Sequence, residues 1–141
     1  MIETLYHLLE SVGFVHPLHP AMTHIPMGMA MGGFVFALIF FLLEKEEFLR
    51  TAYYCISLGL AGILPTVVFG FTDWQYRFGG EWSLLIVMKM IFAVLLTLSF
   101  MTAIKFSLGS KDQHKKILFI YALCLLFATG LGFMGGELQY G

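Results

Sequence analysis

Charged residues are scarce in this sequence: 12% of the 141 residues are Asp, Glu, Lys or Arg, whereas 59% are hydrophobic. An ordinary soluble domain has about 25% charged residues, so the composition is that of a membrane protein. Eight Lys and Arg stand against nine Asp and Glu, and the net charge of −1 leaves no basic surface for nucleic acid. We therefore expect the lipid bilayer, and not nucleic acid, to surround this chain.

Common catalytic and cofactor motifs are also absent. The sequence contains no Gly-x-Ser-x-Gly, no His-Glu-x-x-His and no phosphate-binding loop, so it carries no recognised hydrolase pattern. It has two cysteines, Cys55 and Cys124, both inside apolar runs, and no Cys-x-x-Cys-His. Any heme would accordingly be held without thioether bonds, as a b-type heme is.

What the chain does have is four long apolar runs. At about 1.5 Å per residue, roughly 20 residues cross a hydrocarbon core of about 30 Å. Backbone groups in lipid must pair within a helix or closed barrel, and short loops make consecutive helices neighbours. The sequence therefore predicts one domain, an all-α integral membrane four-helix bundle with helices over residues 20–43, 51–72, 82–105 and 116–136. An amphipathic stretch in residues 1–15 predicts a short interfacial helix before them.

Lys and Arg are distributed unevenly between the two ends of the predicted bundle. The positive-inside rule places the Lys- and Arg-rich ends of transmembrane helices in the cytoplasm. The loops after the first and third helices hold six of the eight such residues, namely Lys45, Arg50, Lys105, Lys111, Lys115 and Lys116. We expect a multi-pass protein of the bacterial inner membrane with both termini outside the cytoplasm and His114 inside.

Three of the five histidines, His16, His19 and His24, cluster at the start of the first long helix. Neutral imidazole is the commonest metal ligand in proteins, and an ionisable group at membrane depth suggests a functional site. His24 follows Pro20 by about one helical turn, so we expect it to face the bundle. His19 precedes His24 by five residues, about 140° around a helix, so the two cannot hold one metal side by side.

This geometry allows at most one heme per chain, with His24 as one axial ligand. The second ligand would come from His16 or His19, from a nearby methionine, or from a partner chain. Gly28 lies four residues after His24 on the same face and leaves room for a flat group. Other small residues at helical spacing, Gly32, Ala128, Gly132 and Gly136, predict close helix packing.

Charged residues near the same end supply further candidates. Lys89 is the one charge inside the third apolar run, and we expect it to pair with Asp73 or Glu137 or to meet a heme propionate or a quinone oxygen. An alternative is a copper, zinc or iron site formed by the three histidines with Asp73 or Glu137. Met22, Met27, Met29 and Met31 beside His24 would suit copper in particular.

The two ends of the sequence, HPLHPAMTHIPMGMA and GFMGGELQYG, resemble the end signatures of a family of small bacterial integral membrane proteins with four helices. In that family His-Pro-x-x-His-Pro and a further His-x-Pro precede the first helix, an Asp-Trp pair follows the second, and Gly-Gly-x-Leu-x-Tyr ends the fourth. The matching residues here are His16, His19, His24, Pro26, Asp73, Trp74, Gly135, Gly136, Leu138 and Tyr140. Relatives fused to Rieske or cytochrome c domains imply membrane redox work. Many relatives have a histidine near the start of the third helix, where this chain has Lys89.

Together these patterns predict an electron-transfer subunit with a b-type heme at its outer end, held by His24 with His19, His16 and Lys89, that passes electrons from quinol to an external redox partner. One alternative is a non-catalytic subunit of a larger membrane complex. The other is the histidine-ligated metal site.

Overall fold

The computed structural model describes residues 2–13, 18–77, 79–109 and 113–140. Within these ranges it is all-helical, as expected. A short helix α1 (Ile2–Ser11) precedes four long ones, α2 (Leu18–Leu43), α3 (Glu46–Arg77), α4 (Leu84–Ser107) and α5 (His114–Tyr140). Each long helix is long and apolar enough to cross a membrane.

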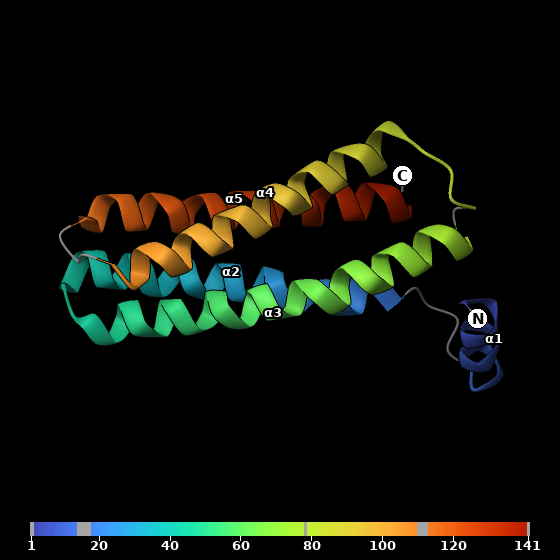
Figure 1. Ribbon diagram of the computed structural model, residues 1–141, viewed down its shortest axis with the longest axis horizontal. Coiled ribbons are helices and arrows are strands. Elements are labelled where there is room, and N and C mark those ends of the chain that lie inside the picture. The colour runs from blue at the N-terminus through green and yellow to red at the C-terminus, as the bar shows by residue number, and fades with distance from the viewer. Residues whose placement is uncertain (1, 14–17, 78, 110–112, 141) are drawn as a thin grey trace.

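The long helices run up and down as a bundle (Figure 1). Each packs against its neighbours in chain order, and α5 closes the arrangement by packing on α2. The α2–α3 turn and the α4–α5 connection lie at one end, which we call the basic end. Both termini and the α3–α4 connection lie at the other, the terminal end. This is the alternation predicted from the sequence.

Helices α2, α3 and α5 extend past the boundaries expected from the apolar runs, whereas α4 begins and ends two residues later than expected. Helix α3 begins at Glu46 instead of residue 51, because Glu46 and Glu47 suit the positive end of a helix dipole. The turn before it is tight: Glu44 adopts a left-handed conformation (φ 55°), and its N–H donates to the Phe40 carbonyl at 2.8 Å. At the start of α4 the Ser83 hydroxyl accepts the Ile86 N–H. Capping residues and turns therefore set the helix boundaries, and these boundaries do not coincide with the ends of the apolar runs.

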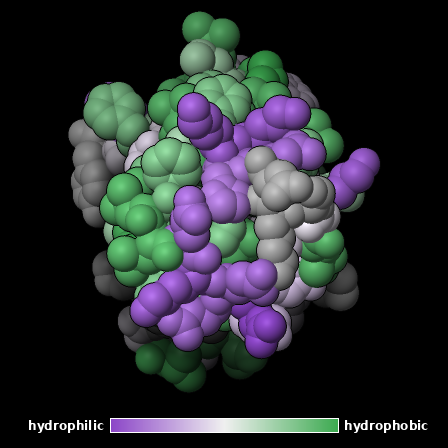
Figure 2. Space-filling view, turned by 90° about the vertical axis from the view of Figure 1, so that its left-hand side faces the viewer, coloured by the Kyte–Doolittle hydropathy of each residue, from purple (hydrophilic) through white to green (hydrophobic). Residues whose placement is uncertain are grey.

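Charged side chains gather at the basic end. Figure 2 views that end and shows hydrophilic side chains across its centre between apolar flanks. Among the described residues, the exposed charged ones there are Glu44, Lys45, Glu46, Glu47, Arg50, Lys105, Lys115 and Lys116. The sides of the bundle, in contrast, expose large apolar residues from every long helix, among them Leu58, Leu64, Val94, Leu98, Phe119 and Phe133. A charged end and apolar sides are what a bilayer-spanning bundle requires.

The apolar core occupies the part of the bundle nearer the basic end. Its buried positions recur every three or four residues, the spacing of helices that pack with a slight left-handed supercoil. They are Ala30, Ala37 and Phe40 on α2, Leu49, Ala52 and Ile56 on α3, Leu96, Phe100 and Ala103 on α4, and Ile117, Tyr121, Cys124 and Ala128 on α5.

The glycines that permit close helix approach are largely not those predicted. At Gly33, Gly59, Gly62 and Gly70 an added Cβ would lie less than 3.0 Å from a side-chain atom of a neighbouring helix. The expected Gly28 and Gly136 have open space instead, whereas Gly132 does lie close to Met27. Helix α5 is packed as closely: an added Cβ would lie 2.5 Å from Met27 of α2 at Gly132 and 2.8 Å from Phe92 of α4 at Gly130.

Candidate functional site

Asp73, near the end of α3, ties three helices together at the terminal end. It is 4% exposed, the one buried charged side chain among the described residues. Its carboxylate accepts the backbone N–H of His19 at 2.7 Å and that of Leu18 at 3.3 Å, and also the Tyr6 hydroxyl of α1. Free N–H groups and a positive dipole end characterise a helix N-terminus, so this carboxylate caps α2 from another helix.

Helix α1 docks through Tyr6, which the sequence did not single out. Tyr6 is 2% exposed, and its ring stacks on Tyr76 of α3 with centroids 4.2 Å apart. The apolar face expected to meet lipid includes Leu8 and Val12, and both are exposed. No sequence signal marked Tyr6, because its partners lie more than 60 residues away.

The His19 ring is held against α3. Its Nδ1 lies 2.9 Å from the Thr66 carbonyl oxygen. A carbonyl can only accept, so Nδ1 carries the proton and Nε2 presents its lone pair in the neutral ring. The ring fits because residue 70 is glycine: an added Cβ would lie 2.8 Å from Nδ1.

Three core-facing positions at the terminal end are polar, although apolar Ile86 and Met134 are buried there as well. His19 lies seven residues before buried Pro26 on α2, Lys89 seven residues before buried Leu96 on α4, and Asp73 continues the core spacing of α3. The Lys89 Nζ lies 4.0 Å from where a Cβ of Gly135 on α5 would stand. Asp73 accepts the His19 backbone N–H, and Lys89 lies at the same end of the bundle on α4.

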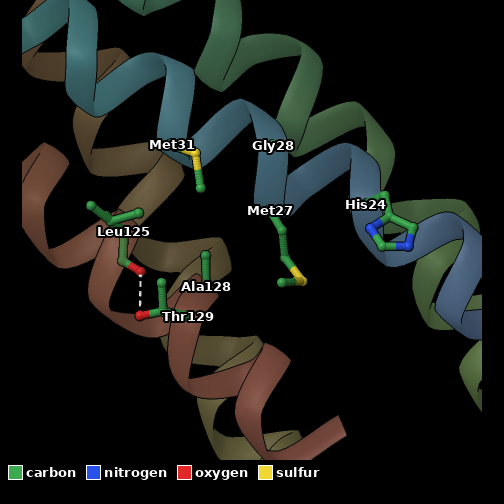
Figure 3. A pocket seen from close by; sticks show the side chains of 7 residues that line it. All are labelled: His24, Met27, Gly28, Met31, Leu125, Ala128 and Thr129. Carbon is green, nitrogen blue, oxygen red and sulfur yellow. Dashed lines mark hydrogen bonds between the residues drawn. The ribbon is translucent and has the colours of Figure 1, made fainter. Parts of the chain in front are cut away.

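His24 lies elsewhere, on an open groove between α2 and α5 (Figure 3). The groove has a volume of about 210 Å³ and is lined by His24, Met27, Gly28 and Met31 from α2 and by Leu125, Ala128 and Thr129 from α5. Met27 and Met31 extend from α2 toward α5, and the His24 ring lies toward the start of α2. The expectation that His24 faces the bundle is wrong, since its side chain is exposed on the outer surface. The expectation that Gly28 shares its face is confirmed.

The predicted ligands do not form one cluster in the described part of the chain. His16 lies outside it. His19 faces α3, His24 faces the lateral groove, and Glu137 is exposed. Among the described residues no three His, Cys, Asp or Glu side chains lie where they could hold one metal ion. A site made of all three histidines with Asp73 or Glu137 therefore receives no support from the residues that the structure describes.

His114 lies at the opposite end, as predicted, with its ring 4.8 Å from that of Phe40. It begins α5 beside the charged surface of the basic end. It is thus remote from both the His24 groove and the polar interior.

These features define a class: a four-helix membrane bundle with an apolar core at one end and, at the other, a polar interior and a lateral histidine groove. Residues 15–141 match the family described as Predicted membrane protein (DUF2231), and the chain belongs to that family. No curated protein and no solved structure matches the chain. The protein is accordingly a multi-pass membrane protein.

Proposed function

We propose that the protein is a membrane electron-transfer subunit that binds a b-type heme through His24. The proposal rests on the position of the His24 imidazole and on its lack of a hydrogen-bond partner. It lies about 9 Å along a membrane-spanning helix, is exposed on the helix surface, and has no hydrogen-bond partner among the described residues. A polar ring without a partner at such a place is costly, and ligation of a metal would satisfy it.

The surroundings of His24 fit a flat ligand. Gly28, one turn further along α2, has no atom within 4 Å of an added Cβ, so a planar group can approach the helix backbone there. Met31 and Leu125 supply apolar walls to the same groove. A groove of about 210 Å³ receives an edge of a macrocycle and leaves the rest against lipid or another chain. A b-type heme supplies reversible one-electron transfer when bound.

His24 supplies one axial ligand in this proposal. His19 is not available for the opposite face of the same heme, because its ring is held by Thr66 and packed at Gly70 on another side of α2. The second ligand would come from His16, from a groove methionine or from a partner chain. The electron donor we propose is a quinol, and the acceptor a redox protein outside the cytoplasm.

A copper site is a second candidate, favoured by the lining of the same groove. His24, Met27 and Met31 all line it, and imidazole with thioether ligands suits Cu(I). A copper ion and a heme would both require His24 as a ligand, so the two proposals exclude each other. A non-catalytic role in a larger complex would need neither.

An absorbance spectrum of the purified protein, with a pyridine hemochrome assay and elemental analysis, tests the proposal. A Soret band and a b-type hemochrome are expected. A colourless protein with stoichiometric copper would overturn heme in favour of the copper site. A colourless, metal-free protein after gentle extraction would favour the non-catalytic role.

The external acceptor requires the terminal end to face away from the cytoplasm. The support is the gathering of Lys45, Arg50, Lys105, Lys115 and Lys116 at the basic end. A topology reporter fused after Gly141 should read as extracytoplasmic, and one inserted at Lys111 as cytoplasmic. The reverse pattern would rule out an external acceptor.

A further inference from the structure

Lys89 lies on the core-facing side of α4 and has no partner among the described residues. It lies about 7.5 Å along α4 from Leu84, on the core-facing side, with Nζ against α5 at Gly135. No described residue forms a salt bridge or hydrogen bond with it. Every buried side-chain nitrogen or oxygen among the described residues does have a partner, so Nζ is not sealed from small molecules. A lysine left unpaired at this depth indicates a ligand that accepts its hydrogen bonds.

The His19 Nε2 presents the opposite chemistry at the same end of the bundle. Because Nδ1 donates to Thr66, Nε2 of the neutral ring is a hydrogen-bond acceptor. Nε2 also has no partner among the described residues and, by the same reasoning as for Nζ, is accessible. The terminal end of the bundle therefore offers a donor on α4 and an acceptor on α2.

A ligand for this pair must accept from Lys89 and donate to His19. A phenolic hydroxyl does both, and a hydroquinone ring carries two of them. Because the sides of the bundle are apolar, a ligand with an apolar tail can reach this end from the bilayer. An anionic headgroup fits less well, since the His19 lone pair and the Asp73 carboxylate, which accepts the His19 backbone N–H, would both repel it.

We propose that Lys89 and His19 bind the hydroxyl-bearing head of a membrane-soluble hydroquinone at the terminal end of the bundle. The small residues Gly70 and Gly135 border the two side chains. The site deepens the proposed function by naming where its electron donor binds, and rests on that function only for the later fate of the electrons. It is separate from the His24 groove.

Titration calorimetry in detergent, performed without oxygen, tests this site with a decyl-substituted 1,4-benzohydroquinone. Lys89→Met loses a charge-assisted hydrogen bond and should lower the affinity for the hydroquinone about tenfold or more. Lys89→Arg keeps a charged donor and should retain most of the affinity. His19→Phe, which removes the acceptor, should also weaken binding. Lys105→Met is the matched control, because it makes the same change on α4 at an exposed position of the basic end.

The outcomes separate this site from its rivals and from the heme. Equal binding by wild type and Lys89→Met, with both proteins folded by circular dichroism, would overturn the proposal. So would Lys89-dependent binding of dihexanoylphosphatidylglycerol without binding of the hydroquinone, which would make the site one for anionic lipid. The titration needs no heme, so a colourless protein that binds hydroquinone would refute only the heme.

Discussion

The Thr66 hydroxyl on α3 takes the place of the backbone N–H that Pro26 on α2 lacks. Pro26 lies inside α2 and is buried, so the Met22 carbonyl four residues earlier loses its helical donor. The single proton of Thr66 Oγ1 is shared between that carbonyl, at 3.1 Å, and the Gly62 carbonyl of its own helix, at 2.8 Å. A helix defect that would otherwise leave an unpaired carbonyl in the membrane is thus satisfied from the neighbouring helix.

This relationship predicts an energetic coupling between the two residues. Thr66→Val should lower the free energy of unfolding by about 1 kcal/mol, the usual size of an interhelical hydrogen bond in a membrane. In a Pro26→Ala background, the N–H of residue 26 can again donate to the Met22 carbonyl. Thr66→Val should then lower the free energy of unfolding by a smaller amount. A double-mutant cycle in detergent measures the difference. Thr97→Val is the control, because the Thr97 hydroxyl donates within its own helix to Ala93; equal costs in both backgrounds of Pro26 would contradict the coupling.

Asp73 should be among the most sensitive positions for stability. Asp73→Ala leaves two N–H groups of α2 and the Tyr6 hydroxyl without their acceptor. We expect a loss of about 3 kcal/mol in the free energy of unfolding, and a smaller loss for Asp73→Asn, which keeps one acceptor oxygen. Denaturant titration monitored by circular dichroism measures both. Exposed Glu81→Ala should be nearly neutral; an equal effect at the two positions would show that Asp73 does not act as this cap.

Gly70 should not tolerate a methyl group. A Cβ would stand 2.8 Å from the His19 Nδ1, so Gly70→Ala should displace the ring from Thr66 and cost about 1–3 kcal/mol of stability. Gly136→Ala meets no atom within 4 Å and should leave stability unchanged or raise it by up to about 1 kcal/mol through helix propensity. Thermal unfolding of the two variants compares them directly. Equal stability would mean that His19 is not held as described.

The four-helix bundle followed from the sequence because lipid leaves the backbone few choices. Length and apolarity fixed the number of long helices, and the short connections fixed their alternation. Helix ends were less predictable: α3 begins five residues before its expected start, since acidic residues at a helix N-terminus extend it beyond the apolar run. The orientation of the bundle in the membrane remains a prediction from charge.

The site was only partly readable from the sequence. His24 and Gly28 could be placed on one helix face by spacing alone, and they share a groove. Which way that face points depends on the packing of α2 against α3 and α5, and spacing within one helix does not determine it. Tyr6, Thr66 and Gly70 were missed because each acts through a partner at least 40 residues distant in sequence. The role of Asp73 as a helix cap was hidden for the same reason.

The measurement that tests the central claim most directly is the heme content of His24→Ala. His24 is the histidine that lies unpartnered on the lateral groove, so its removal should abolish or severely deplete the Soret absorbance per protein. His114→Ala is the matched control, because His114 lies at the basic end. The absorbance spectrum of this variant should equal that of the wild type. Retention of a normal low-spin b-type spectrum in His24→Ala would contradict the assignment of this residue as the heme ligand.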